Sequence, residues 1–364
     1  MSRMVWMLQV VVLLLAMGPN ATKADSFVFV SLLQERKIVT FQRSVDSGEL
    51  RQTQITECSA EPAYLTASKD GRVLFVSYRS TGQLAAFHID ASTGALQLIN
   101  VVEAGEDPAF LIPDRTGRFL LTAYYVSNKV TVHGVHADGR LSEKPVCSLP
   151  TATNAHGVSI DSKNQSVYVS HTGANRIDQF RFDQETGILT ALDPPFVTAN
   201  AIQNPRHIMI HPSDRWAYCS NEAGGSNEDG ASLYARDSKT MQLKQEQSVL
   251  SLPETFDANQ NSTAECLLTP DGQLLYVANR GHNSIAGFSV DQSNGRLKRV
   301  SITPTEAVPR SFTISPDGRH LYVAGETSGR VASYAIKASG ELKLLDIVES
   351  GPISWAIVAM DIND

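Results

Sequence analysis

A short apolar strand pattern recurs seven times along the chain. Each copy runs over about five residues and ends on a small or polar residue, while helical periodicity is nearly absent. A turn such as Asp271-Gly272 or Asp317-Gly318 usually precedes the copy, which predicts an antiparallel hairpin. The copies occupy 27–31, 74–78, 120–124, 167–171, 217–221, 275–279 and 321–325.

A third and a fourth strand follow each copy, as at 285–291 and after the turn Ser293-Asn294-Gly295. Four strands in a unit of about 49 residues are typical of a β-propeller blade. Another strand precedes each hairpin and also counts seven. These strands are expected to begin at Pro62, Pro108, His156, Pro205, Glu265, Pro309 and Pro352. The sequence therefore predicts an all-β fold, a seven-bladed β-propeller of four-stranded antiparallel blades.

The chain does not begin and end at the boundaries of whole four-stranded units. The chain opens on a second-strand copy at Phe27 and closes on a first-strand copy from Ser354 to Met360. We expect these strands to pair and complete one blade, because that closes the ring and leaves no free sheet edge. Residues 25–364 are thus predicted to form a single domain.

Residues 1–24 have the layout of a secretory signal peptide. Arg3 is followed by an apolar stretch from Met4 to Met17, and small residues up to Ala24 offer a cleavage site. We expect an exported protein, periplasmic or secreted, with no membrane contact after cleavage; an uncleaved anchor is the alternative. The mature chain would have 340 residues and a net charge of −9.

Composition narrows the function classes. The full chain has 31 basic and 38 acidic residues, which argues against a nucleic-acid or anionic-membrane binder. After the first two dozen residues no apolar run is long enough for a transmembrane helix. Cys58, Cys147, Cys219 and Cys266 lack CxxC spacing, so we expect free thiols rather than a zinc site. We expect a monomer.

Propeller geometry predicts where a site should lie. The starts of first strands and the ends of second strands meet at one mouth of the central channel, and their polar residues gather in the later blades. A solvated rim is the alternative interpretation. The first-strand starts contribute Glu61, Asp107, His156, Arg206, His207, Glu265 and Arg310. The second-strand ends contribute Arg79, Tyr124, His171, Asn221, Glu222, Asn279, Arg280, His282 and Glu326.

Two runs carry a family resemblance, one from Asn204 to Glu222 and one from Pro270 to Ser284, followed by Pro309-Arg310-Ser311-Phe312. They resemble the seven-bladed β-propeller lactonases, the family of bacterial propeller-type 6-phosphogluconolactonase and fungal 3-carboxy-cis,cis-muconate cyclase. The resemblance implies a lactone hydrolase, or a related muconate cycloisomerase. It places the catalytic positions on His156, Arg206, Glu222 and Arg280. The chain departs from the family pattern at His171 and at Gly325-Glu326, which bears on the substrate.

Lactone hydrolysis needs a general base for water and positive charge over the developing oxyanion. His156 or Glu222 could be the base. Arg206 and Arg280 offer forked donors to a carboxylate, a phosphate or the oxyanion, although an Arg206–Glu222 ion pair could be purely structural. We assign substrate binding to His207, Asn221, Glu265, Asn279, His282 and Arg310, among which His207 and His282 could serve only in packing.

We predict no metal and no cofactor. Glu222, Glu265, Asn221 and Asn279 could supply oxygen ligands, but nearby arginines would repel a divalent cation. Two functions remain at this point. One is an exported lactonase acting on a small anionic or carbohydrate-derived lactone, as in 6-phosphogluconolactone hydrolysis. The other is a non-enzymatic propeller that serves as a ligand-binding or protein-interaction scaffold.

Overall fold

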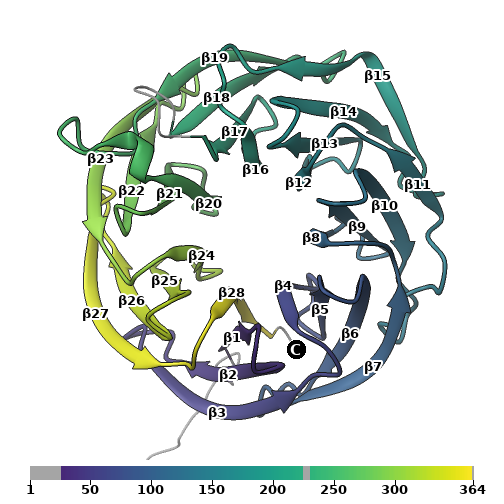
Figure 1. The fold of residues 1–364 in the computed structure, drawn as a ribbon, viewed down its shortest axis with the longest axis vertical. Coiled ribbons are helices and arrows are strands. Elements are labelled where there is room, and N and C mark those ends of the chain that lie inside the picture. The colour runs from purple at the N-terminus through teal and green to yellow at the C-terminus, as the bar shows by residue number, and fades with distance from the viewer. Residues whose placement is uncertain (1–25, 224–229, 363–364) are drawn as a thin grey trace, which may run out of the picture.

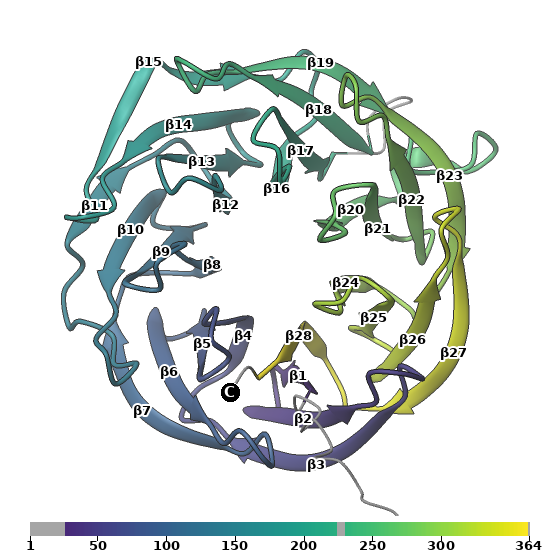
Figure 2. The ribbon, with the colours of Figure 1, turned by 180° about the vertical axis from the view of Figure 1, so that it is seen from behind.

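Seven four-stranded antiparallel sheets surround a central channel in the computed structural model, which describes residues 26–223 and 230–362 (Figure 1). The predicted signal peptide 1–24 lies outside the described residues. Figure 2 shows the ring from the other side, again with the first strand of each sheet innermost. The prediction of an all-β, seven-bladed propeller is confirmed.

Six blades are built from consecutive strands. The first three are β4 (Pro62–Ala67), β5 (Val73–Tyr78), β6 (Gln83–Ile89), β7 (Leu96–Glu103); β8 (Pro108–Pro113), β9 (Phe119–Tyr124), β10 (Lys129–Gly134), β11 (Cys147–Pro150); and β12 (Ala155–Ile160), β13 (Ser166–His171), β14 (Arg176–Phe182), β15 (Leu189–Thr198). The next three are β16 (Pro205–Ile210), β17 (Trp216–Asn221), β18 (Ala231–Arg236), β19 (Leu243–Val249); β20 (Ser262–Leu268), β21 (Leu274–Arg280), β22 (Ser284–Val290), β23 (Leu297–Pro304); and β24 (Pro309–Ile314), β25 (His320–Gly325), β26 (Arg330–Ile336), β27 (Leu342–Glu349). A 3₁₀ turn, η1 (Ala258–Gln260), precedes β20.

The seventh blade joins the two ends of the chain. It contains β28 (Ser354–Asp361), β1 (Ser26–Leu32), β2 (Lys37–Arg43) and β3 (Leu50–Glu57), in that order from the channel outward. β1 and β28 pair antiparallel, with Phe27 opposite Met360. The predicted ring closure is confirmed.

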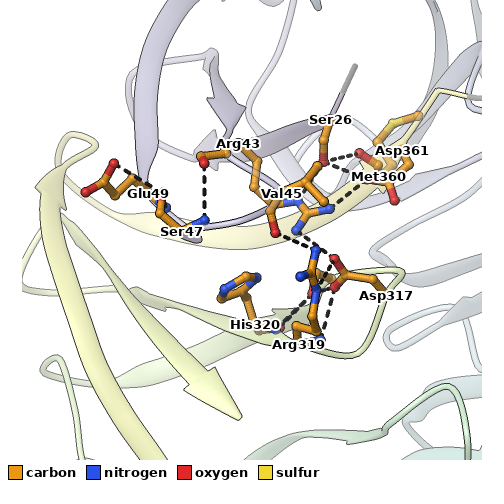
Figure 3. A network of polar contacts seen from close by, with 12 residues as sticks. Ser26, Arg43, Val45, Ser47, Glu49, Asp317, Arg319, His320, Met360 and Asp361 are labelled. Carbon is orange, nitrogen blue, oxygen red and sulfur yellow. Dashed lines mark hydrogen bonds and ion pairs between the residues drawn. The ribbon is translucent and has the colours of Figure 1, made fainter. Parts of the chain in front are cut away.

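A buried arginine bonds to both ends of the chain where the ring closes (Figure 3). Arg43, on β2, donates from Nε to Ser26 Oγ at 2.6 Å and from Nη2 to Asp361 Oδ1 at 2.9 Å. Its Nη1 lies 3.5 Å from Oδ2 of Asp317, in the turn between β24 and β25 of the neighbouring blade. One side chain therefore links the first strand, the last strand and the adjacent blade.

The tyrosines of the repeated strand explain part of the sequence pattern. Tyr168, Tyr218 and Tyr276 are fully buried, and each hydroxyl donates to a backbone carbonyl in the next blade's turn between third and fourth strands. The acceptors are Met241, Gly295 and Gly340. Each such bond contributes about 1 kcal/mol and also satisfies a hydroxyl that burial would otherwise leave unpaired.

The predicted starts of the inner strands are partly wrong. β4, β8, β16 and β24 begin at the expected prolines, whereas β12 and β20 begin at Ala155 and Ser262. β28 begins at Ser354, as the closure argument expected, and not at Pro352. The four cysteines are free, as predicted; Cys147, Cys219 and Cys266 are buried and Cys58 is half-buried. Among the described residues, no helix is long and apolar enough to cross a membrane.

Candidate active site

Each of the seven inner strands breaks its register near its start, always at the same channel mouth. In β12, for example, Ala155 pairs with His171 and Gly157 with Ser170, so that His156 has no partner opposite. A bulge of this kind bends the strand and re-aims a side chain. The residues freed in this way are Ala63-Tyr64, Ala109, His156, Arg206-His207, Ala264-Glu265, Arg310 and Trp355.

The residue before an inner strand often has a left-handed backbone conformation. Val308 precedes β24 with φ 54° and Ile353 precedes β28 with φ 53°, and β-branched residues rarely adopt such angles. Asp107, Asn154 and Asn204 take the same conformation before β8, β12 and β16. Strain of this kind costs on the order of 1–3 kcal/mol per residue, and the surrounding sheets must hold it in place.

Most of the freed side chains gather around a small hollow at the channel mouth. Its lining is Tyr64, Arg79, Ala109, His156, Arg206, His207, Glu265, Arg310, Ser311 and Trp355. The space among them is about 10 Å³, which is room for about one water molecule. Any ligand larger than a water molecule must therefore bind on the outer side of this layer or displace some of its side chains.

One polar chain crosses the hollow through Arg206, His207 and Glu265. Nη1 of Arg206 lies 3.2 Å from Nε2 of His207, and Nδ1 of His207 lies 2.6 Å from Oε1 of Glu265. Because an arginine can only donate, His207 Nε2 is the acceptor and its Nδ1–H donates to the carboxylate. Burial lowers the pKa of His207, so the ring is neutral and both of its nitrogens are engaged.

Glu222 holds two arginines together. Its Oε1 accepts from Arg280 Nη2 at 2.8 Å and lies 3.4 Å from Nε of Arg206. Although burial acts to raise it, the positive charges of Arg206 and Arg280 lower the pKa of Glu222. Glu222 is therefore a fixed anion. Arg280 Nη2 also donates to Ser262 Oγ at 2.6 Å and to the Thr263 carbonyl at 3.1 Å.

His156 differs from His207 because its Nδ1 makes no hydrogen bond to any described residue. It is 4% exposed, and its Nδ1 is buried. Its ring centroid lies 5.1 Å from that of His207 and 5.6 Å from that of Tyr125. Burial and then the charge of Arg206 hold the pKa of His156 well below its ordinary value. The ring is thus a neutral proton acceptor at neutral pH.

Arg310 and Arg79 lie near Trp355. The Arg310 guanidinium carbon is 3.6 Å from the centroid of the Trp355 ring, and that of Arg79 is 5.9 Å away. Arg79 forms a two-pronged ion pair with Asp107, in which Nη2 reaches Oδ2 at 2.6 Å. Arg310 has only a longer approach, 3.7 Å from Nη1 to Oε2 of Glu326. Burial and the charges of Arg206 and Arg280 lower the pKa of Arg310 to about 9, so it stays charged.

Several of the predicted site residues do not line this hollow. Asn221 is fully buried and donates to Ser232 Oγ, and Asn279 donates to the Ser251 carbonyl and to Ser284 Oγ. His282 packs edge-on against Phe256, with ring centroids 4.7 Å apart. These side chains order the loops around the mouth.

The two carboxylates considered as metal ligands have other partners, since Glu222 contacts Arg206 and Arg280 and Glu265 contacts His207. No group of three His, Cys, Asp or Glu side chains within 26–223 and 230–362 is arranged to hold a metal ion. His171 is fully buried, with Nε2 3.6 Å from Asp178 Oδ2, and burial lowers its pKa to about 4.

The sequence reasoning missed Tyr64, Ser311 and Trp355. Ser311 Oγ lies 3.4 Å from Oε2 of Glu265, and Tyr64 packs against Phe110 with ring centroids 4.3 Å apart. Trp355 stands second in its strand, as Arg310 and His156 do in theirs. This shared second position could have identified Trp355 as a site residue. The repeat count, however, put the start of the strand at Pro352, which makes Trp355 its fourth residue.

Comparisons with known proteins agree with this architecture. A family model described as "Lactonase, 7-bladed beta-propeller" matches residues 27–355. A 6-phosphogluconolactonase from Pectobacterium carotovorum is 28% identical over 235 residues, which cover 64% of this chain and 69% of that protein. One from Erwinia tasmaniensis is 32% identical over 174 residues, covering 48% and 50%.

Solved structures agree as well. The structure of a periplasmic gluconolactonase from Pseudomonas aeruginosa superposes with a TM-score of 0.81 at 26% identity, and the superposition covers 91% of this chain and 98% of that one.

Proposed function

Since the chain belongs to the family of seven-bladed β-propeller lactonases, we propose that it hydrolyses the ring ester of a small carbohydrate-derived lactone at the channel mouth. The observation that carries this proposal is the uncommitted neutral imidazole of His156 among arginines that cannot lose their charge. A proton acceptor and an adjacent positive field are the two things that ester hydrolysis requires.

His156 serves as the general base in this proposal. His207 is engaged at both nitrogens, and Glu222 is held by two arginines. His156 has a buried nitrogen with no partner among the described residues, and the hollow beside it has room for about one water. The imidazole takes a proton as the water oxygen attacks the lactone carbonyl carbon. It returns that proton to the ring oxygen when the carbon–oxygen bond breaks.

The arginines stabilise the transition state. Negative charge develops on the carbonyl oxygen during attack, and preorganised donors in a water-poor site stabilise such charge most. Arg206 is 2% exposed, and Glu222 and His207 fix its guanidinium. Because these contacts exist before substrate binds, no reorganisation is needed during the reaction.

Two observations support the proposed substrate class: the names of the similar proteins and the charge of the residues that line the hollow. The relatives from P. carotovorum and E. tasmaniensis are named 6-phosphogluconolactonases, and the P. aeruginosa relative is named a gluconolactonase. The hollow is lined by three arginines, Arg79, Arg206 and Arg310, against the single carboxylate of Glu265, and this excess of positive charge favours an aldonolactone with a negative group. Export of the mature chain also belongs to this proposal; the P. aeruginosa relative is named periplasmic.

Proton release during lactone opening provides the test. The purified protein is assayed with glucono-δ-lactone, 6-phosphoglucono-δ-lactone and a carboxylated muconolactone, with spontaneous hydrolysis subtracted. Wild type should open at least one of them, and His156→Ala should lower kcat by about 10²–10⁴-fold. His88→Ala, at an exposed histidine on β6, is the matched control and should keep its rate. Absence of turnover with every lactone would overturn the proposal and favour the scaffold alternative.

A further inference from the structure

Among the arginines of the mouth, Arg310 differs in what its guanidinium contacts. Arg79 is held by Asp107, Arg206 donates to His207, and Arg280 donates to Glu222, Ser262 and Thr263. The guanidinium of Arg310 makes no hydrogen bond to any described residue, and Glu326 is its only ion-pair partner there, at 3.7 Å. Its whole set of donors is therefore free for a ligand, whereas on Arg206 the Nε is buried without a hydrogen-bond partner among the described residues and Nη1 is bonded to His207.

An aromatic ring holds this guanidinium in place. At 3.6 Å from the centroid, the guanidinium carbon of Arg310 is in contact distance above the face of Trp355. A cation is attracted by the face of an aromatic ring, and tryptophan binds it best. Since the N–H groups of a guanidinium lie in its own plane, contact through its face leaves them free at the edge, whereas pairing with a carboxylate consumes them.

The fold places Trp355 beside Arg310 and across the channel from His156. It comes from β28, the strand that closes the ring, and its bulge aims it into the mouth beside Arg310 of the adjacent blade. The blades of His156 and Arg206 are the two farthest from it around the ring (Figure 1). An anionic group held at Arg310 would thus leave the rest of a small lactone to extend toward His156.

We propose that Trp355 is a positioning residue that presents Arg310 as the receptor for the anionic group of the substrate, a phosphate or a carboxylate, and so sets the preference for charged over neutral lactones. This inference rests on the proposed function. It assigns Arg310 to recognition of the distal anion and leaves Arg206 with the oxyanion.

A matched pair of substrates tests it. 6-Phosphoglucono-δ-lactone and glucono-δ-lactone differ only in the phosphate, so the ratio of their kcat/KM values measures recognition of that group. Arg310→Gln should lower this ratio at least tenfold, mainly through KM. Trp355→Leu, which keeps apolar bulk but loses the aromatic face, should lower it about 3- to 10-fold. Trp355→Phe should restore part of the loss. Trp216→Phe, at a buried tryptophan outside the hollow, is the control and should leave the ratio unchanged.

Two outcomes overturn the inference while the proposed function stands. If Arg310→Gln lowers the ratio and Trp355→Leu does not, Trp355 has no positioning role. If neither variant changes the ratio, Arg310 is not the anion receptor. A merely structural role of Trp355 would lower turnover of both lactones equally and leave the ratio intact.

A binding measurement separates this inference from failure of the enzyme hypothesis. In Trp216→Phe protein prepared without residues 1–24, Trp355 is the remaining tryptophan. Its fluorescence is titrated with inorganic phosphate and, separately, with acetate. A saturable change with either anion that disappears in Arg310→Gln supports the anion receptor even if no lactone is hydrolysed. The responding anion shows whether phosphate or carboxylate is preferred. No saturable change with either anion overturns the inference.

Discussion

Nη2 of Arg43 lies 2.9 Å from Oδ1 of Asp361, and this contact joins the second strand of the chain to the last. The Arg43 side chain is buried, whereas Asp361 is one-quarter exposed. An ion pair that spans nearly the whole sequence at the point of ring closure has a direct consequence for folding: the blade cannot close without both ends of the chain.

Arg43→Met should destabilise the protein by about 3 kcal/mol, because the change leaves Asp361 and Asp317 without their buried partner. Equilibrium unfolding in urea measures this loss. Lys37→Met, which removes surface ion pairs with Glu35 and Glu57, is the control and should cost less than about 0.5 kcal/mol. Equal stability of the two variants would show that Arg43 does not fasten the ring.

Acid should weaken the same closure. Partial burial acts to raise the pKa of Asp317, but hydrogen bonds from Ser315 and Arg319 and the charge of Arg43 lower it to about 2. Because the unfolded side chain titrates near ~3.9, the unfolded state binds the proton first as pH falls. The contribution of Asp317 is therefore complete above pH ~4 and disappears between pH ~4 and ~2.

Asp317→Asn tests this linkage. The substitution should cost about 1–2 kcal/mol at pH 7, and the difference from wild type should shrink as pH falls from about 4 to 2. Asp138→Asn, at an exposed carboxylate, should give a small difference at every pH. A constant gap between wild type and Asp317→Asn across this range contradicts the prediction.

Gly157 lies where the blade that carries His156 packs closely against the blade that carries Arg206. A Cβ at this position would lie 2.5 Å from the backbone oxygen of Arg206 and 2.7 Å from Ser170 Oγ. Gly157→Ala should cost about 1–3 kcal/mol through overpacking and should also lower turnover by displacing Arg206. Gly134→Ala, where the nearest atom would be 3.6 Å away, is the matched control. Thermal melting and lactone turnover are compared for both.

Arg280→Lys should reduce turnover about 10²–10³-fold although charge is conserved. Arg280 donates from Nη2 to Glu222 and from Nε to the Ser262 carbonyl, and the single nitrogen of a lysine cannot occupy both positions. Arg299→Lys, which weakens bonds to the Leu250 and Leu252 carbonyls away from the mouth, is the control. If both lysine variants turn over lactone at the wild-type rate, Arg280 has only a structural role.

The pH profile should reflect the burial of His156. An ordinary histidine would halve the rate near pH ~6.5, but the pKa of His156 lies well below that value, so its imidazole stays deprotonated at lower pH. With glucono-δ-lactone, which carries no titrating group, kcat/KM should be flat from pH ~6 to ~8 after spontaneous hydrolysis is subtracted. An acid limb centred near pH ~6.5 would point to a different base.

The sequence by itself determined the architecture and the channel mouth at which the candidate site was expected. Alternating apolar residues and Asp-Gly turns act over a few neighbouring positions, so the seven-fold repeat is visible without tertiary information. The phase mismatch between Phe27 and Ser354 likewise predicted closure, because an unpaired β edge is unfavourable. His156, Arg206, Glu265 and Arg310 line the mouth as this reasoning expected.

Only the tertiary structure decided which of these polar residues are free to act. Whether a histidine is engaged depends on partners from other blades, as His207 does on Glu265, 58 positions further along the chain. The bulges that push Trp355 into the hollow and leave Asn279 outside depend on sheet register. Register and burial arise when the ring closes and distant strands pack together, and no local pattern of residues encodes those distances.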